Sequence, residues 1–528
     1  MHPGVHAVHS PAKPAAVQAE TGEVLTYATL ADNSRRLARY LHDQGLRPDD
    51  HLALLTDNTL RAFEVHWAAL RSGLHITAVN RHLTPDEISY IVDDCGAKAL
   101  VVSARLKDLV ERLGVPGVAV RLAYGVRSGP GRPDGGRPDR DLPEAYTPYA
   151  AALAEASDKP LPDLPRGTDM LYSSGTTGRP KGIHKELPGV AVDEIPTMVA
   201  SIVALNDFDR DTVYLSPAPI YHAAPLRFAE AVHSLGGTVV LMERFDAEGA
   251  LAAIERYRVT HSQWVPTMFV RMLKLDPQVR ERYDLSSQRF AVHAAAPCPV
   301  DVKRAMIDWW GPVVNEYYSS TEANGLTFIG SQEWLERPGS VGRALLGTVH
   351  VCDELGAELS AGKVGIVYFA RDEATFSYHN DPAKTARAQH PDRPNWTTTG
   401  DMGYLDEDGY LFLTDRTDFM VISGGVNIYP QEIEGSLALH PRVLDVAVIG
   451  VPDPEMGESV KAVVQTPDGV VGDDELADEL QAHLRERIAG YKVPRSFDFV
   501  DELPRTPSGK LLKHQLRRRY VKPDAAPR

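Results

Sequence analysis

The chain has 528 residues, of which 43% are hydrophobic and 24% are charged, and its formal net charge is −16. A chain of this length is expected to form two or more domains, because a single hydrophobic core stops growing at smaller sizes. The negative charge argues against general nucleic-acid binding, and the few scattered cysteines do not suit a disulfide framework or a zinc site. No apolar run could span a bilayer and no signal peptide is apparent, so we expect a cytoplasmic protein with no integral membrane segment.

Strand and helix patterns alternate along the first part of the chain. Apolar spacing predicts a helix from residue 27 up to Gly45, a second helix through 63–70 that ends at Gly73, and a third after the start signal at 84–87. Short strands accompany these helices, at 51–55, 75–79 and 99–102. Because the alternation continues for most of the first 410 residues, the predicted fold class is α/β with parallel sheet layers.

Two segments depart from this alternation. Residues 128–142 are rich in Gly, Pro, Arg and Asp and have no apolar face, which is typical of an inserted loop. The pattern at 409–413 predicts one strand of a hairpin, and a compact unit of about 110 residues follows it. We therefore predict a large N-terminal domain of layered α/β subdomains over 1–415, a hinge at 416–418, and a small mobile α+β domain over 419–528.

The most informative segment is a run of glycines and hydroxyl side chains that follows a buried strand pattern at 170–172. Glycines let the main chain approach a ligand closely, and successive N–H groups together with hydroxyls form a concave anion site. The run therefore predicts a polyphosphate-binding loop, although its lysine is followed by Gly182 rather than by the Ser or Thr of the common P-loop. The expected ligand contacts are Ser173, Ser174, Gly175, Thr176, Thr177, Gly178 and Lys181.

Five further motifs follow this loop in order. They are Asn-Glu-Tyr-Tyr-Ser-Ser-Thr-Glu at 315–322, Trp-Thr-Thr-Thr-Gly-Asp at 396–401, Asp-Arg-Thr-Asp at 415–418, Ser-Gly-Gly-Val-Asn-Ile-Tyr-Pro at 423–430 and Pro-Arg-Thr-Pro-Ser-Gly-Lys at 504–510. Together with the loop they resemble the adenylate-forming superfamily, which includes acyl- and aryl-CoA synthetases, adenylation domains of peptide synthetases and beetle luciferase. The resemblance extends from about Leu25 to about Arg519.

The resemblance implies an enzyme, an AMP-forming acid–thiol ligase that uses ATP, Mg²⁺ and CoA. A carboxylic acid would react at the α-phosphate of ATP to give an acyl-adenylate, and CoA would then take the acyl group. The catalytic residues it implies are Lys510, Thr177, Glu322 and His222, with Glu322 also as the protein ligand of Mg²⁺. Lys510 would bridge the carboxylate and the α-phosphate, and His222 would gate the acyl pocket, contact the acyl carboxylate or merely line a wall.

The resemblance also implies a nucleotide site downstream of the loop. Tyr318 would stack on adenine, Asp401 would accept two hydrogen bonds from the ribose hydroxyls, and Arg416 would reach ribose or phosphate. The complete downstream set is Ala295, Ala296, Pro297, Glu316, Tyr317, Tyr318, Ser319, Thr321, Asp401 and Arg416. Ser319 stands where the family usually has glycine, which bears on the efficiency of adenylation.

Acyl and CoA contacts are implied in the same way. The acyl pocket would be built from Tyr221, His222, Trp264, Val265, His293, Ala294 and Ser320. Alanines leave room there, and no charged residue is evident that would bind a second polar group of the acid. We therefore expect a bulky apolar acid, either polycyclic and steroid- or terpenoid-like, or long-chain. The CoA tunnel would pass Ser423, Gly424 and Gly425, and Asp418 would be the hinge that turns the small domain between the two half-reactions.

Three alternatives stay open at this point. The chain could be a thioesterifying half-enzyme that uses an acyl-adenylate made elsewhere, or a stand-alone adenylation domain that loads a carrier protein. The region 216–226 lacks the aspartate that amino-acid adenylation domains usually place there, which favours CoA. A nucleotide-dependent sensor on the same fold is disfavoured by the joint presence of Glu322, Asp401, Arg416 and Lys510. A homodimer is left open.

Overall fold

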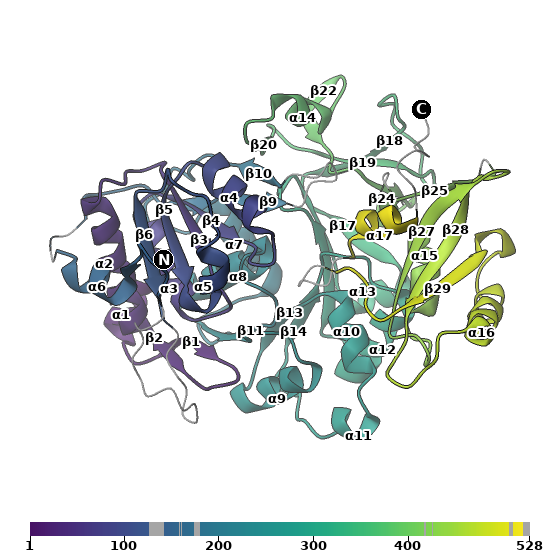
Figure 1. Cartoon of the computed structure of the whole chain (residues 1–528), viewed down its shortest axis with the longest axis horizontal. Coiled ribbons are helices and arrows are strands. Elements are labelled where there is room, and N and C mark those ends of the chain that lie inside the picture. The colour runs from purple at the N-terminus through teal and green to yellow at the C-terminus, as the bar shows by residue number, and fades with distance from the viewer. Residues whose placement is uncertain are drawn as a thin grey trace. The chain divides into compact units, whose positions relative to one another are not determined.

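The computed structural model describes residues 1–125, 142–157, 159, 161–173, 180–416, 419–424, 426–505 and 511–520, with the side chains of 415 and 416 excluded (Figure 1). The predicted insertion at 128–142 lies almost wholly outside this part. The chain divides into two compact units. The first unit comprises Met1–Gln263, Gln278–Phe290 and Phe376–Pro382, and the second comprises Trp264–Pro277, Ala291–Thr375 and Ala383–Arg528. Within the described residues, no helix has the length and apolar character needed to cross a membrane.

A parallel sheet forms one part of the first unit, in the order β7-β6-β5-β3-β4-β8. The predicted strands are present. β3 and β4 have the predicted bounds, and β5 is longer at both ends than the strand predicted at 99–102. The bounds are β3 His51–Leu55, β4 His75–Val79, β5 Ala97–Ser103, β6 Val120–Tyr124, β7 Thr147–Pro148 and β8 Thr168–Asp169. The predicted helices are also present, as α2 Tyr27–Asp43, α3 Arg61–Arg71 and α4 Pro85–Asp94, and Thr84 and Glu87 cap α4 reciprocally.

The first unit also contains a mixed set of strands, in the order β2-β1-β12-β11-β13. These are β1 Pro14–Gln18, β2 Val24–Thr26, β11 Val213–Ser216, β12 Thr238–Leu241 and β13 His261–Trp264, accompanied by α1 Pro3–His9, α6 Tyr149–Glu155, α7 Thr197–Asn206, α8 Ala223–Leu235 and α9 Ala247–Tyr257. A small antiparallel sheet, β20-β10-β9, consists of β9 Leu171–Ser173, β10 Lys181–His184 and β20 Ser377–Tyr378.

The second unit begins with a parallel strand pair and continues as antiparallel sheet. β14 (Phe290–His293) pairs in parallel with β15 (Val314–Ser319), and the following pairs are antiparallel. The later strands are β16 Leu326–Ile329, β17 Ser340–Leu346, β18 Thr348–Cys352, β19 Gly365–Ala370, β21 Gln389–His390, β22 Arg393–Thr397, β23 Asp401–Leu405 and β24 Leu411–Arg416. The helices are α10 Pro266–Leu273, α12 Val300–Trp310, α13 Ser331–Glu336 and α14 Pro382–Arg387.

This part refines two sequence predictions. The strand–helix alternation expected for most of the first 410 residues is present up to β15, and antiparallel pairing follows, because short connections such as 320–325 can join antiparallel neighbours and are too short for a helical crossover. The hairpin strand predicted at 409–413 begins at Leu411 instead. Gly409 lies in the turn before it, where its φ of +81° suits glycine.

The end of the second unit is an α+β arrangement with its own hydrophobic clusters. In Figure 1, β27 and β28 run side by side as long arrows, and β29 pairs with β28 in parallel. The elements are β25 Val421–Ser423, β26 Val426–Ile428, β27 Asp445–Asp453, β28 Gly457–Gln465, β29 Ser496–Val500, α15 Pro430–Leu437, α16 Asp474–Arg485 and α17 Lys513–Tyr520. The α/β fold with a small α+β C-terminal part is as predicted, whereas the domain boundary at 415–419 and its hinge stay predictions.

Candidate active site

The predicted phosphate loop is carried by a β-hairpin of the first unit. Ser173, at the end of β9, lies opposite Lys181, at the start of β10, so the two strands hold the ends of the loop together. A Cβ added to Gly182 would lie 2.9 Å from the Tyr172 ring, which explains why a glycine follows the lysine. The loop residues Ser174, Gly175, Thr176, Thr177 and Gly178 lie outside the described part of the chain, so their contacts stay predictions.

Side chains anchor the strand that leads into this loop. Arg227 donates two hydrogen bonds to the Asp169 carboxylate, at 3.0 and 2.7 Å, and both side chains are buried. Burial alone would raise the pKa of Asp169, but the Arg227 guanidinium overrides it and holds that pKa well below its usual range. The Tyr172 hydroxyl donates to Asp94 at 2.6 Å, and burial and this hydrogen bond raise its pKa. The hairpin therefore has a fixed base.

In the second unit, strand pairing and a side-chain hydrogen bond bring three predicted nucleotide residues together. The Tyr318 hydroxyl, on β15, donates to Oδ2 of Asp401 at 2.7 Å, and Asp401 is the first residue of β23. Asp401 pairs across the strands with Arg416 on β24. Thr399, which the sequence analysis did not single out, donates to the same Asp401 oxygen at 2.9 Å. An aromatic ring, a carboxylate and a cationic residue thus come from three strands of one sheet.

The turn after β15 holds further predicted residues. The Ser319 hydroxyl donates to the Gly325 carbonyl at 2.7 Å, so it is engaged within its own turn. Ser320 donates to Asn324 at 2.9 Å, and Thr321 and Glu322 form the turn between them. The Glu322 side chain is 8% exposed. A Cβ on Gly325 would collide with the ring of Phe369, whose centroid lies 5.9 Å from that of Tyr318, so a glycine is required behind the Tyr318 ring.

A buried charged cluster lies where β14 and β15 pair. His293 on β14 is opposite Glu316 on β15, and Lys303 Nζ, from α12, lies 2.6 Å from Oε2 of Glu316. Burial raises the pKa of Glu316, Lys303 opposes that rise, and burial together with Lys303 lowers the pKa of His293 well below its usual range. The Glu316 carboxylate is therefore engaged by Lys303 instead of facing solvent. Lys303 was not predicted, because a lone lysine early in a helix usually indicates a solvated surface.

The loop between β14 and α12 contains the predicted residues Ala294, Ala295, Ala296 and Pro297. The Ala294 N–H donates to the Trp264 carbonyl at 3.3 Å. Ala295 has a φ of +73°, a left-handed conformation that costs an alanine about 1 kcal/mol. Such strain persists where the surroundings determine the backbone, and it gathers at ligand sites.

The predicted acyl-pocket residues are distributed over the two units. In the first unit the rings of Tyr221 and His222 lie 4.5 Å apart, and burial raises the pKa of Tyr221. In the second unit Trp264 is 1% exposed, and its ring meets those of Trp310 and Phe269 at 5.4 and 6.2 Å. Val265, His293 and Ala294 are also buried, and Ser320 is half-buried. The pocket that these residues would form stays a prediction.

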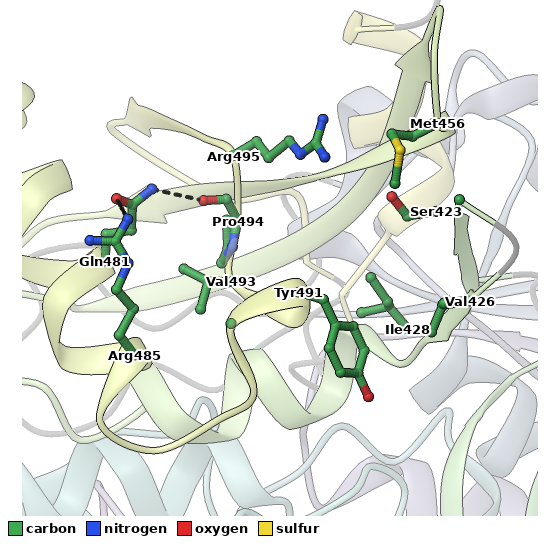
Figure 2. Close-up of a pocket in the computed structure, with 12 residues that line it drawn as sticks. Ser423, Val426, Ile428, Met456, Gln481, Arg485, Tyr491, Val493, Pro494 and Arg495 are labelled. Carbon is green, nitrogen blue, oxygen red and sulfur yellow. Dashed lines mark hydrogen bonds between the residues drawn. The ribbon is translucent and has the colours of Figure 1, made fainter.

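The predicted CoA contacts Ser423 and Gly424 line a cavity of about 290 Å³ near the C-terminal end (Figure 2). Gly424 has a φ of +58°, and a Cβ there would collide with Met456. The cavity is also lined by Arg485, Tyr491 and Arg495, which the sequence analysis missed because they belong to none of its motifs. Gly425, Asp418 and Lys510 lie outside the described residues, as does the Arg416 side chain.

Comparisons with known proteins identify the family and the fold. The model of the AMP-binding enzyme family matches residues 5–379, and that of the AMP-binding enzyme C-terminal domain matches 432–510. A feruloyl-CoA synthase of Amycolatopsis sp is 35% identical over 94% of each chain. A 3-[(3aS,4S,7aS)-7a-methyl-1,5-dioxo-octahydro-1H-inden-4-yl]propanoyl:CoA ligase of Rhodococcus jostii is 34% identical over 93% of each. The structure of the amide bond synthetase McbA from Marinactinospora thermotolerans superposes with a TM-score of 0.79 at 29% identity, covering 98% of this chain and 99% of that one. The chain therefore belongs to the AMP-binding enzyme family, as its motifs predict.

Proposed function

We propose that the chain is an ATP-dependent acyl-CoA ligase that activates a bulky apolar carboxylic acid through an acyl-adenylate and transfers it to CoA. The observation that carries this proposal is the grouping of Tyr318, Asp401 and Arg416 on three strands of one sheet. Each of these residues has the chemistry to contact a different part of a nucleotide: the ring the base, the carboxylate the ribose, the cation the ribose or phosphate. Family membership supports the same conclusion.

The first half-reaction brings two anions together, a carboxylate and the triphosphate of ATP. The loop between β9 and β10 would hold the phosphates with main-chain N–H groups, and Lys181 and Lys510 would add positive charge. Asp401 and Tyr318 would fix the adenosine. A carboxylate oxygen is a ligand that Mg²⁺ prefers, and Glu322, nine-tenths buried in the turn after β15, suits that role beside the phosphate oxygens. When bound, Mg²⁺ would neutralise charge on the triphosphate.

The second half-reaction requires a site for CoA, a highly anionic molecule with a slim thiol arm. The cavity lined by Ser423 and Gly424 supports this assignment, because Arg485 and Arg495 offer cations beside a glycine that permits close passage. The thiol would lose its proton to solvent and attack the acyl carbonyl as the thiolate, the acyl–phosphate bond would break, and AMP would leave with the bonding electron pair.

The class of acid is the finer part of the proposal. Trp264, Val265 and Ala294, which the resemblance places in the acyl pocket, are apolar, uncharged and buried. The similar enzymes named for feruloyl-CoA and for an indenylpropanoyl-CoA act, by those names, on acids with ring systems. We therefore propose a ring-containing or long-chain acid in preference to acetate.

The test is CoA-thioester formation followed by mass spectrometry, with a panel of short, fatty, aromatic and polycyclic acids plus ATP, Mg²⁺ and CoA. Parallel reactions receive presynthesised acyl-adenylates in place of acid and ATP. Thioester from free bulky acids supports a complete ligase, and turnover of acetate alone overturns the assignment of the acid. Thioester only from the adenylates would identify a half-enzyme, and Ser319→Gly would then be expected to restore use of the free acid.

A further arm supplies a phosphopantetheinylated carrier protein instead of CoA. Faster loading of the carrier than of CoA would replace the ligase assignment by the carrier-loading one. Arg485→Ala and Arg495→Ala sharpen this arm, because the loss of either cation is expected to raise the KM for CoA and to leave the KM for ATP unchanged.

A further inference from the structure

We propose that Lys303 is a positioning residue for the nucleotide: through its buried ion pair with Glu316 it holds the strand that carries Tyr318 and the strained loop at Ala295 in one arrangement. The inference rests on the proposed function, since it concerns the adenosine end of that site. Lys303 is itself no predicted ligand contact, and its partner Glu316, which the resemblance placed in the nucleotide site, is engaged by Lys303. It would act through the two segments it joins.

Both charged side chains of the pair are buried, which a well-packed core does not require. Lys303 is 0% exposed and Glu316 is 5% exposed, with 2.6 Å between Nζ and Oε2. Removing two charges from water is costly, and apolar side chains of similar size would often be at least as stable in such a position. A buried pair that is retained therefore calls for another role, and fixing one arrangement of the backbone is a role that buried polar pairs can have.

The pair connects two segments of the predicted site. Lys303 lies in the first turns of α12, directly after the loop that contains Ala295. Glu316 lies on β15, two residues before Tyr318, and alternate residues of a strand point to the same face. The loop begins after His293 on β14, and His293 is paired in register with Glu316 on β15. The ion pair thus ties the C-terminal end of the loop, where α12 begins, to β15, which lies beside the start of the loop.

In the described part of the chain, one other basic side chain is recorded beside the Glu316 carboxylate, and it does not replace Lys303. His293 Nε2 lies 3.4 Å from the same Glu316 oxygen, but His293 is fully buried and the low pKa that burial and Lys303 impose keeps it neutral. The Lys303 ammonium also lies 4.7 Å from the centre of the Trp334 ring, which is 1% exposed and fixes the lysine from the other side. The positive charge that faces Glu316 is therefore that of Lys303.

The test compares AMP affinity, measured by calorimetry, and steady-state kinetics in four proteins. Lys303→Met removes the ammonium and keeps the apolar stem. Lys303→Met/Glu316→Met removes both charges and is expected to recover thermal stability. Arg166→Met is the matched control, because Arg166 pairs with Glu230 at 2.7 Å with comparable burial in the first unit and belongs to no predicted ligand contact. The wild-type chain is the fourth.

We expect the Kd for AMP and the KM values for ATP and for the acyl-adenylate to rise about tenfold in both Lys303 variants, with the KM for CoA within about twofold of wild type. Arg166→Met should lower the thermal stability and leave all four constants unchanged. A purely structural role would lower kcat through a smaller folded fraction and would not raise these constants. If Lys303→Met fails to fold, the double variant gives the same readout.

Unchanged AMP affinity in the double variant, or an equal rise in Arg166→Met, would overturn the inference while leaving the ligase assignment intact. A wild-type chain that binds AMP but forms no thioester would overturn the ligase assignment alone, and the AMP affinities would still decide the role of Lys303. A wild-type chain that does not bind AMP would overturn both.

Discussion

The two regions that carry the predicted nucleotide contacts are built in different ways. The hairpin of β9 and β10 holds its loop between strands adjacent in sequence, and its base is fixed by side chains, above all by Asp169 and Arg227. The site of the second unit draws on Tyr318, Asp401 and Arg416: the pairing of β23 with β24 places the last two, and a hydrogen bond joins Tyr318, on β15, to Asp401. We infer that the stability of the first region depends strongly on its buried Asp169–Arg227 pair, whereas the hydrogen bond between Tyr318 and Asp401 contributes less to stability because Thr399 donates to the same oxygen.

The largest expected effect is at the base of the hairpin. Arg227→Met would leave the Asp169 carboxylate buried without its partner, so we expect a loss of about 3–5 kcal/mol in the free energy of unfolding. Asp169→Leu in the same chain should return most of that loss, because the pair is then replaced by apolar side chains. Urea unfolding of the two variants measures both effects. A single variant within about 1 kcal/mol of wild type would contradict the dependence on this pair.

A second effect, in the first unit, depends on pH. Burial lowers the pKa of His233, in the first unit, to about 3, although its hydrogen bond to the Ala15 carbonyl opposes that shift. At pH values between about 3 and the unfolded-state pKa near 6.5, His233 binds a proton in the unfolded chain but not in the folded chain. The stability that His233 contributes is therefore complete above pH 6.5 and is lost as the pH falls toward 3.

For His233 alone this loss amounts to about 3 kcal/mol between pH 6.5 and pH 4. His233→Gln can still accept from Trp67 and donate to Ala15, so its unfolding free energy should fall less steeply with acid. Unfolding curves at several pH values from 4 to 7 measure the slope. Parallel slopes in wild type and variant would show that another group controls the acid loss.

Sequence reasoning was most accurate where the pattern is local. The strand at His51–Leu55 and the capped helix at Pro85–Asp94 depend on periodicity and cap residues within one segment, so they were predicted closely. The change to antiparallel pairing after Ser319 was missed, although a hairpin strand near Leu411 was predicted, because the apolar pattern of a strand does not state the direction of its neighbour.

The candidate site divides in the same way. Tyr318 and Asp401 were found through motifs in order, whereas no motif states the hydrogen bond between them, which joins two strands that are not neighbours in the sheet. The Lys303–Glu316 pair was missed because a single lysine in a helix, or a single glutamate in a strand, usually indicates an exposed surface. The loop residues from Ser174 to Gly178 and Lys510 stay predictions, since they lie outside the described part of the chain.

The smallest expected effect concerns the hydrogen bond between Tyr318 and Asp401 in the second unit. Tyr318→Phe removes one hydroxyl that donates to Asp401, and a hydrogen bond to a charged group contributes about 1.5–3 kcal/mol where both partners are ordered. Because the pairing of β23 with β24 holds Asp401 in place and Thr399 still donates to the same oxygen, we expect the thermal stability to change little and the KM for ATP to rise several-fold.

Tyr404→Phe, on the same strand as Asp401 and stacked on Phe412, is the matched control and should leave that KM unchanged. If Tyr318→Phe instead lowers the stability as much as Arg227→Met does, the second site depends on side-chain pairs as the first does, and the contrast between the two regions is wrong.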